Sequence, residues 1–148
     1  MSDLTPTEAR RTLGALLRLP YAALVGRVYG RLAGRGFPGI RVAHGAVLRH
    51  IRPSGSRLTE LAERAGMAKQ SMAYLVEDLT GLGFLGSVPD PSDGRARLVR
   101  LTAKGRRLMA VMLALSAEAE EELAAKIGAA EMRTLRRVLE KVVAALEP

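Results

Sequence analysis

The segment from Lys69 to Leu82 separates apolar from hydrogen-bonding side chains at helical spacing. The apolar residues recur at steps of three and four, typical of a buried helix face, and they are Met72, Leu75, Val76 and Leu79. The opposite face carries Gln70, Ser71 and Tyr74. An amide and two hydroxyls near the start of a helix can hydrogen-bond base edges in a DNA major groove, where glutamine pairs with adenine. This face is therefore a candidate base-reading surface.

Two more residues of this segment fit the same chemistry. The methyl group of Ala73 can contact thymine, and Lys69, in the first turn, is placed for a phosphate. Glu77 and Asp78 would repel phosphates, so we expect them to mark where the helix leaves the groove. The alternative for each polar residue is an ordinary solvent-facing position on an amphipathic helix.

A basic segment follows. Leu85–Val88 and Arg97–Leu101 are β-competent, and the turn formers PDPSDGRA between them predict a two-stranded hairpin. From residue 95 to residue 107 the chain has no acidic side chain, and its basic side chains are Arg95, Arg97, Arg100, Lys104, Arg106 and Arg107. Such a run can neutralise phosphates and release their counterions. A solvated basic face is the alternative.

Other kinds of site have little support. The sequence has no cysteine and two histidines, His44 and His50, which excludes disulfides, thiolate metal sites and thiol redox chemistry. A metal site would need both histidines together with carboxylates, so we expect no metal and no cofactor. Paired catalytic carboxylates and a glycine-rich phosphate loop are also missing from the sequence, and we therefore do not expect an enzyme.

Composition limits the remaining possibilities. The 148 residues suit one domain, and a net charge of +8 favours a polyanionic partner, either nucleic acid or a lipid surface. No apolar run reaches the roughly 18 residues of a membrane span, and MSDLTPTEARR lacks the apolar stretch of a signal peptide. We expect a cytoplasmic protein without a membrane partner; peripheral membrane binding is the alternative explanation of the charge.

Helices must position these residues, because alanine and leucine dominate the chain and aromatic residues make up 3% of it. Thr5, Pro6 and Glu8 predict a helix start, Pro20 predicts a break or a kink, and Thr59 predicts a helix cap. The helices that we expect span 5–18, 20–35, 40–51, 59–66, 69–82 and two stretches after residue 102 that are separated at residue 128. With the tight turn Ala65-Gly66-Met67-Ala68 and the hairpin, this order predicts a mainly α winged helix-turn-helix.

The segment from Ser56 to Gly105 resembles a known family. SRLTELAERAGMAKQSMAYLVEDLTGLGFL followed by SVPDPSDGRARLVRLTAKG is similar to the winged helix-turn-helix of MarR-family transcriptional regulators. The resemblance implies that Asp93 and Arg95 form the family's wing signature, in which the arginine enters the minor groove. We expect Asp93 to orient Arg95 through a charge-assisted hydrogen bond, and Arg97 to bind DNA beside it. Ala68 replaces the usual capping serine or threonine, and Gly94 replaces a common arginine.

Apolar stripes at both ends of the chain exceed what a small winged domain covers alone. Their members are Leu13, Leu16, Leu17, Leu135, Val138, Leu139, Val142, Val143 and Leu146. With the resemblance, they predict a homodimer on a near-palindromic double-stranded operator. We thus expect a single MarR-like domain over 1–148, in which 1–35 and 103–148 form the dimerisation region with terminal dimerisation helices, and 40–102 form the DNA-binding region. An intrachain helical core is the alternative.

The resemblance also implies a small-molecule effector, an aromatic or phenolic acid that releases the repressor from DNA. The residues that could line its site are Tyr29, His44, Arg49, Met109 and Met112. A structural role for the histidine and core filling for the methionines are the alternatives. A constitutive or architectural DNA-binding protein without an effector is the alternative function.

Overall fold

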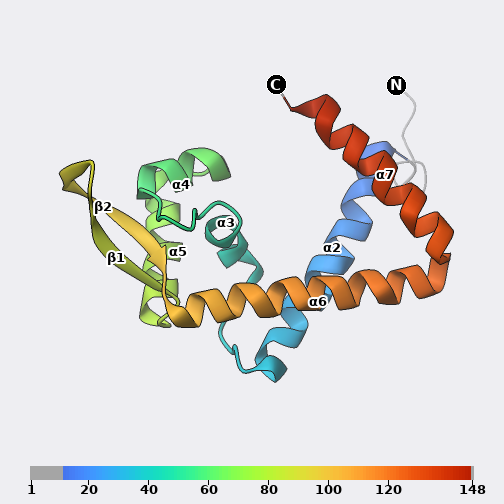
Figure 1. Cartoon of the computed structure of the whole chain (residues 1–148), viewed down its shortest axis with the longest axis horizontal. Coiled ribbons are helices and arrows are strands. Elements are labelled where there is room, and N and C mark those ends of the chain that lie inside the picture. Colours follow the sequence, from blue (N-terminus) through green and yellow to red (C-terminus); the bar gives the residue numbers. More distant parts are fainter. Residues whose placement is uncertain (1–11, 148) are drawn as a thin grey trace, which may run out of the picture. The chain divides into compact units, whose positions relative to one another are not determined.

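The computed structural model describes residues 12–147, so the predicted helix start at Thr5 lies outside the described residues. The elements, labelled in Figure 1, are α2 (Leu13–Leu32), η1 (Ala33–Arg35), η2 (Val42–His44), α3 (Gly45–Leu48), α4 (Leu58–Ala65), α5 (Lys69–Gly81), β1 (Leu85–Asp90), β2 (Asp93–Leu101), α6 (Ala103–Ile127) and α7 (Ala129–Leu146). The described chain is mainly helical, and its one sheet is a two-stranded antiparallel hairpin. This confirms the predicted winged helix-turn-helix fold class.

The chain divides into two compact units. One comprises Val28–Leu113 and holds the helix-turn-helix and the hairpin, and the other comprises Met1–Arg27 with Ala114–Pro148. Both boundaries fall inside long helices, α2 and α6. The assignment of the second unit to dimerisation stays a prediction.

The helix-turn-helix has the predicted tight turn. Helix α4 ends at Ala65, because Gly66 after it has a left-handed φ of 63°, and the Met67 N–H donates to the Ala62 carbonyl at 3.0 Å. The prediction that Thr59 caps α4 is wrong, because the helix already begins at Leu58. Instead, the Glu60 side chain, in the first turn of α4, accepts the backbone N–H of Arg57 at 3.4 Å.

Helix α5 buries the face that its periodicity predicts. Met72, Leu75 and Leu79 are buried and Val76 is half-buried. The other buried residues of this unit's core include Val47, Leu48, Leu61, Phe84, Leu85 and Leu108. These neighbours fix the rotation of α5 about its axis, and therefore fix which side chains the helix presents to solvent.

The hairpin is longer than predicted, because β1 extends to Asp90 and β2 begins at Asp93. The connecting turn is therefore short. The carboxylate of Asp90 accepts the backbone N–H of Ser92 at 2.8 Å and its hydroxyl at 2.7 Å. This side-chain turn replaces the longer loop that the turn-forming composition suggested. Residue 56 adds a short bridge to β2, in which the Ser56 N–H donates to the Val99 carbonyl at 2.9 Å.

Two predicted helix boundaries are wrong. Helix α2 runs unbroken through Pro20. Pro20 has no N–H to donate to the Leu16 carbonyl one turn earlier. Leu16 is 56% exposed, so water can hydrogen-bond that carbonyl instead. The helix predicted over 40–51 is only Gly45–Leu48, preceded by a 3-10 turn, because Arg41 is extended and donates its N–H to the His44 side chain.

The last two helices confirm the predicted break at Gly128, where φ is 98°. On α6, Leu108, Leu115 and Ala119 are buried, and on α7 Met132 is buried. The rest of the α7 stripe is half-buried or exposed, up to 79% exposure at Leu146. None of the helices in the described range is long and apolar enough to span a bilayer.

Candidate nucleic-acid interface

The exposed face of α5 presents the predicted base-reading residues together. Lys69, Gln70 and Ser71 are exposed, Tyr74 is 61% exposed, and Ala73 is half-buried. A shallow groove beside this face is lined by Ala43, Met67, Ala68, Gln70, Ser71, Tyr74 and Leu75. Such an array of amide and hydroxyl groups on a protruding helix can donate to and accept from base edges.

The start of α5 has no side-chain cap. Ala68 occupies the cap position in an extended conformation, and its methyl group makes no capping hydrogen bond. The first turn, which contains Lys69, keeps N–H groups without helical acceptors. Such groups, together with the positive end of the helix dipole, favour an anion, which for a nucleic acid is a backbone phosphate.

A closed ring of hydrogen bonds holds α5 against η2. The Arg41 N–H donates to His44 Nδ1 at 2.9 Å, His44 Nε2 lies 2.7 Å from Asp78 Oδ2, and Arg41 Nη2 donates to the same oxygen at 2.6 Å. The Arg41 guanidinium, followed by the His44 imidazole, holds the pKa of the Asp78 carboxyl below its usual value. Sequence analysis interpreted Asp78 as the end of the DNA-facing surface and missed this anchoring contact.

His44 is fully buried within that ring. Both of its ring nitrogens have partners, which matches the structural alternative that its sequence context left open. Its effector-lining role stays a prediction that these contacts do not support.

The hairpin tip exposes Arg95. Asp93 does contact it, but the bond shown is from the backbone N–H of Arg95 to Asp93 Oδ1, at 3.0 Å. The carboxylate thereby orients the main chain, and the guanidinium is left to solvent. Arg97 differs, because its Nε donates to the Ser87 hydroxyl at 2.7 Å and its Nη2 to the Ser87 carbonyl at 3.0 Å. Arg97 therefore spans the two strands while remaining exposed.

Arg57 and Asp90 form an ion pair that sequence analysis missed. Arg57 Nε and Nη2 lie 2.8 and 2.7 Å from Asp90 Oδ2. The hydrogen bonds from the Ser92 hydroxyl and N–H, followed by that from Arg57, lower the pKa of Asp90 to about 2. The Asp-Pro-Ser turn in the sequence could have identified the Ser92 contact, but nothing local indicates Arg57, which is 33 residues away.

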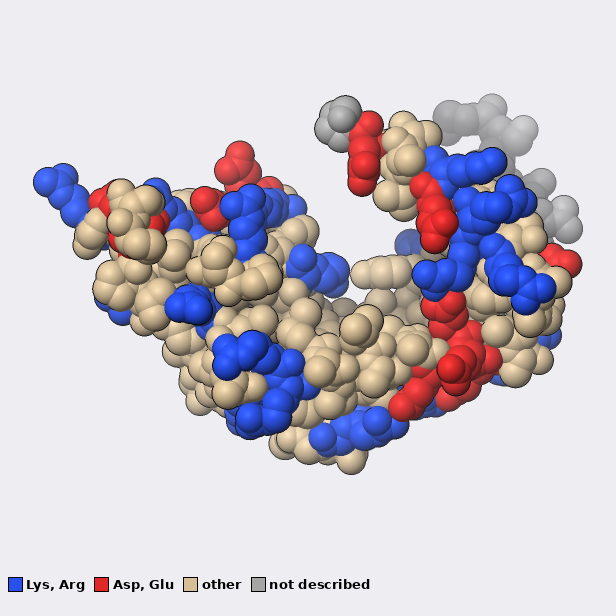
Figure 2. Space-filling view, in the orientation of Figure 1, with Lys and Arg blue, Asp and Glu red and all other residues tan. Residues whose placement is uncertain are grey.

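Two other basic side chains of this segment hydrogen-bond backbone carbonyls within the same unit. Lys104 Nζ donates to the Leu82 carbonyl at 2.8 Å and lies 4.5 Å from the centre of the Phe84 ring. Arg106 Nη1 donates to the Leu101 carbonyl at 3.2 Å. Both side chains remain exposed, and Figure 2 shows basic groups at the hairpin tip and over the start of α6. A phosphate backbone can therefore meet positive charge at the hairpin tip and at the start of α6.

Of the predicted effector residues, the structure brings Tyr29 and Arg49 together over Gly45. A Cβ atom at Gly45 would lie 2.7 Å from Tyr29 Oη and 2.6 Å from Arg49 Nη1. Met109 and Met112 are half-buried on α6.

Known proteins are similar to this chain. A family described as a winged helix DNA-binding domain matches residues 43–105, which include the reading face and the hairpin. The HTH-type transcriptional repressor Rv2887 of Mycobacterium tuberculosis is 31% identical over 88 residues, which are 60% of this chain and 63% of the repressor. Its crystal structure, as a MarR family protein in complex with salicylic acid, aligns at 30% identity and a TM-score of 0.67, over 88% of this chain and 96% of that chain.

Two further solved structures extend the comparison. Wild-type MarR of Escherichia coli, in its apo form, has a TM-score of 0.74 at 25% identity, over 88% of this chain and 96% of that chain. The repressor CouR, bound to a 23-mer DNA duplex, has a TM-score of 0.70 at 25% identity, over 96% of this chain and 99% of that one. These relatives are regulators and not enzymes, as the sequence predicts for this chain. The chain belongs to the MarR family of winged-helix, DNA-binding transcriptional regulators.

Proposed function

We propose that this chain is a homodimeric repressor that binds a near-palindromic DNA operator and releases it when a small aromatic or phenolic acid binds. The observation that carries the proposal is one unit in which Gln70, Ser71 and Tyr74 are exposed on α5 while Arg95 is exposed at the hairpin tip. A helix and a wing of this kind suit adjacent major and minor grooves.

The roles of the DNA-binding residues follow from their chemistry. Gln70, Ser71 and Tyr74 read base edges, and the Ala73 methyl group contacts thymine. Lys69 and Arg97 bind phosphates. Asp93 holds the main chain of Arg95 at 3.0 Å, so that the guanidinium can enter a narrow minor groove. CouR in complex with a 23-mer duplex supports this use of the fold.

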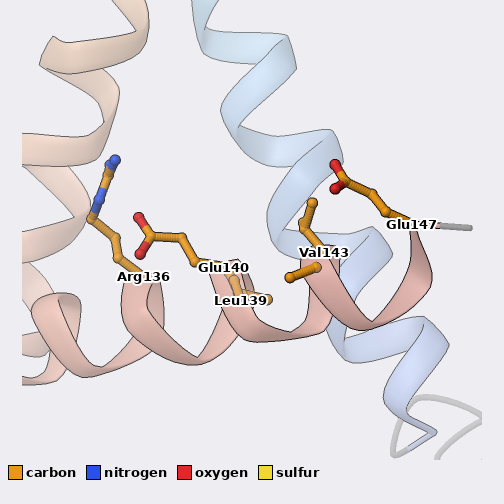
Figure 3. A pocket seen from close by; sticks show the side chains of 6 residues that line it. Arg136, Leu139, Glu140, Val143 and Glu147 are labelled. Carbon is orange, nitrogen blue, oxygen red and sulfur yellow. The ribbon is translucent and has the colours of Figure 1, made fainter.

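The exposed apolar side chains of α7 and α2 support a two-fold dimer. Leu135, Val138, Val143 and Leu146 are 40–79% exposed, as are Leu13, Leu16 and Leu17 at 40–69%. Figure 3 shows Leu139 and Val143 in a hollow on α7 between Arg136 and Glu147. Burial of such a surface contributes about 25 cal/mol per Å², which favours its coverage by a second copy. Two recognition helices would then read two related half-sites.

Tyr29 and Arg49 support the effector part of the proposal. A guanidinium and a phenol over one glycine can bind the carboxylate and the ring hydroxyl of a phenolic acid. Rv2887 has been solved with salicylic acid and CouR with p-coumaroyl-CoA, so related folds hold phenolic compounds. Met109 and Met112, half-buried on α6, complete the proposed lining, whereas the buried and doubly bonded His44 fits its structural alternative.

The test combines DNA selection with a competition measurement. Fragments of the source genome bound by the full chain are sequenced, and binding to the recovered duplex is titrated with and without salicylate. We expect recovery of a near-palindrome and release by the acid. Gly45→Ala is expected to displace Tyr29 and Arg49 and to abolish release while DNA binding persists. Gly34→Ala is the matched control, because no atom lies within 4 Å of a Cβ there.

The alternative is a constitutive or architectural DNA-binding protein. DNA binding that no tested aromatic acid changes would favour it. Failure to bind any duplex in a salt-sensitive manner would contradict both functions.

A further inference from the structure

Asp90 is the buried residue of an exposed turn. Its exposed fraction is 6%, whereas residues 91–95 are all exposed. Each of its carboxylate oxygens has two partners: Oδ1 accepts the N–H and the hydroxyl of Ser92, and Oδ2 faces Nε and Nη2 of Arg57. The carboxylate thus joins the hairpin turn to Arg57, the residue that precedes α4.

A second contact anchors the same hairpin nearer its base. Ser56 and Val99 exchange backbone hydrogen bonds of 2.9 and 2.8 Å, and the buried hydroxyl of Ser56 accepts the Arg52 N–H at 3.0 Å. Residues 56 and 57 therefore hold the hairpin at two points along its length. Two separated attachments restrict the direction of the hairpin as well as its position.

The strand pairing relates Asp90 to the wing arginine. Asp90 pairs with Asp93 across the hairpin, and the Asp93 carboxylate accepts the Arg95 N–H at 3.0 Å. The main chain that carries Arg95 is therefore connected to the residue before α4 by the Arg57–Asp90 ion pair, the strand pairing of Asp90 with Asp93 and the bond from the Arg95 N–H to Asp93. Helix α5 follows α4 directly.

We propose that Arg57 is a positioning residue for DNA recognition: its bond to Asp90 sets where the Arg95 guanidinium enters the minor groove relative to α5. The inference rests on the proposed function, because it assumes that Arg95 contacts DNA. Arg57 acts through Asp90 and Asp93 and does not need to touch the nucleic acid. A correctly placed arginine in a narrow, A·T-rich minor groove gains from its enhanced negative potential, and a displaced one does not.

A direct phosphate contact by Arg57 is the competing role, since its side chain is 37% exposed. Asp90→Asn separates the two roles. This change raises the net charge by one and leaves Arg57 free for a phosphate, so a direct contact predicts binding that is unchanged or tighter. A positioning role predicts weaker binding despite the added positive charge.

The experiment is a set of anisotropy titrations of the full chain on a duplex that the wild type selects, at one salt concentration. Arg57→Gln and Asp90→Asn are measured alone and combined with Arg95→Ala. Arg137→Gln is the charge-matched control, because it removes an exposed cation from the other unit at a position that does not line the α7 hollow. A second duplex replaces the A·T pairs under the wing with G·C pairs, and thermal unfolding of each variant is recorded.

We expect Arg57→Gln and Asp90→Asn each to weaken DNA binding about five- to tenfold and to reduce the preference for A·T flanks. In the Arg95→Ala background, the same changes should alter the affinity less than about twofold. Arg57→Lys keeps the charge without the two-nitrogen contact and should lose a similar factor, so the inference stays testable if Asp90→Asn unfolds. Tighter binding by Asp90→Asn, an equal loss in the Arg95→Ala background, or wild-type affinity in Arg57→Lys would overturn the inference. A wild type that binds no duplex would instead overturn the proposed function.

Discussion

His44 and Asp78 are 34 residues apart in the chain, and their side chains meet with Nε2 and Oδ2 2.7 Å apart. The other imidazole nitrogen, Nδ1, accepts the backbone N–H of Arg41 and therefore carries no proton. The proton lies on Nε2, which donates to the Asp78 carboxylate. The buried imidazole therefore connects Arg41, the extended residue before η2, to Asp78 of helix α5.

Replacement of His44 by leucine should destabilise this connection. His44→Leu keeps an apolar side chain in a fully buried position but leaves the Arg41 N–H without its acceptor. We expect a loss of about 1–3 kcal/mol in the free energy of unfolding, the usual cost of a buried polar group without a partner. Urea unfolding followed by circular dichroism measures it. His50→Leu, at a half-buried position outside the ring, should change stability less, and an equal loss in both variants would contradict this role.

Gly105 should not tolerate a side chain. A Cβ atom there would overlap the carbonyl oxygen of Phe84, which already accepts the N–H of Thr102 at 3.0 Å and cannot withdraw easily. We expect Gly105→Ala to lose about 1–3 kcal/mol through overpacking. Thermal unfolding checks this against Gly26→Ala, where no atom lies within 4 Å and α2 should gain helix propensity. Similar melting temperatures for the two variants would rule out the expected clash.

Asp90 should make stability depend on acid pH. Hydrogen bonds from Ser92, followed by that from Arg57, lower its pKa in the folded chain to about 2, below the ordinary 3.8. A lowered pKa means that the contribution of Asp90 to stability is complete above about pH 4 and is lost as the pH falls towards 2. Urea midpoints of wild type and Asp90→Asn between pH 2 and 6 should converge at the acid end. Parallel curves over that range would contradict the assignment.

The apolar face of α7 should determine the oligomeric state. Val143 is 57% exposed in the single chain, so Val143→Glu should leave the helix content unchanged. We expect it to convert a dimer to a monomer, because an unpaired carboxylate would be buried in the interface. Light scattering coupled to size exclusion measures the mass. Thr134→Glu adds the same charge on the opposite side of α7 and should remain dimeric; a wild-type monomer would refute the interface.

The elements that the sequence predicts well are those with strong local signals. The apolar face of α5 and the glycine ends at Gly66 and Gly128 are encoded by neighbouring residues, and the structure confirms them. The local signals at Pro20 and Thr59, in contrast, predict the helix boundaries wrongly. A proline costs one hydrogen bond in a solvated helix, and a threonine does not cap when a later glutamate satisfies the helix start.

Only some residues of the candidate site could be predicted from the sequence. Gln70, Tyr74 and Arg95 could be selected because their side chains suit nucleic-acid chemistry within a recognisable motif. The ring around Asp78 and the pair of Arg57 and Asp90 could not be selected, since each joins residues more than thirty positions apart. Nothing in a local window specifies which arginine meets which aspartate.

The most direct test of the account compares Gln70→Ala with Arg95→Ala in salt-matched titrations on the selected duplex and on a scrambled duplex. Gln70 lies on the base-reading face, so its loss should cost about 1–3 kcal/mol on the selected duplex and little on the scrambled one. Arg95→Ala should weaken binding to both duplexes and reduce the salt dependence by about one counterion. Equal effects of the two substitutions on specificity, or no effect of either on binding, would contradict a reading helix assisted by an arginine-bearing wing.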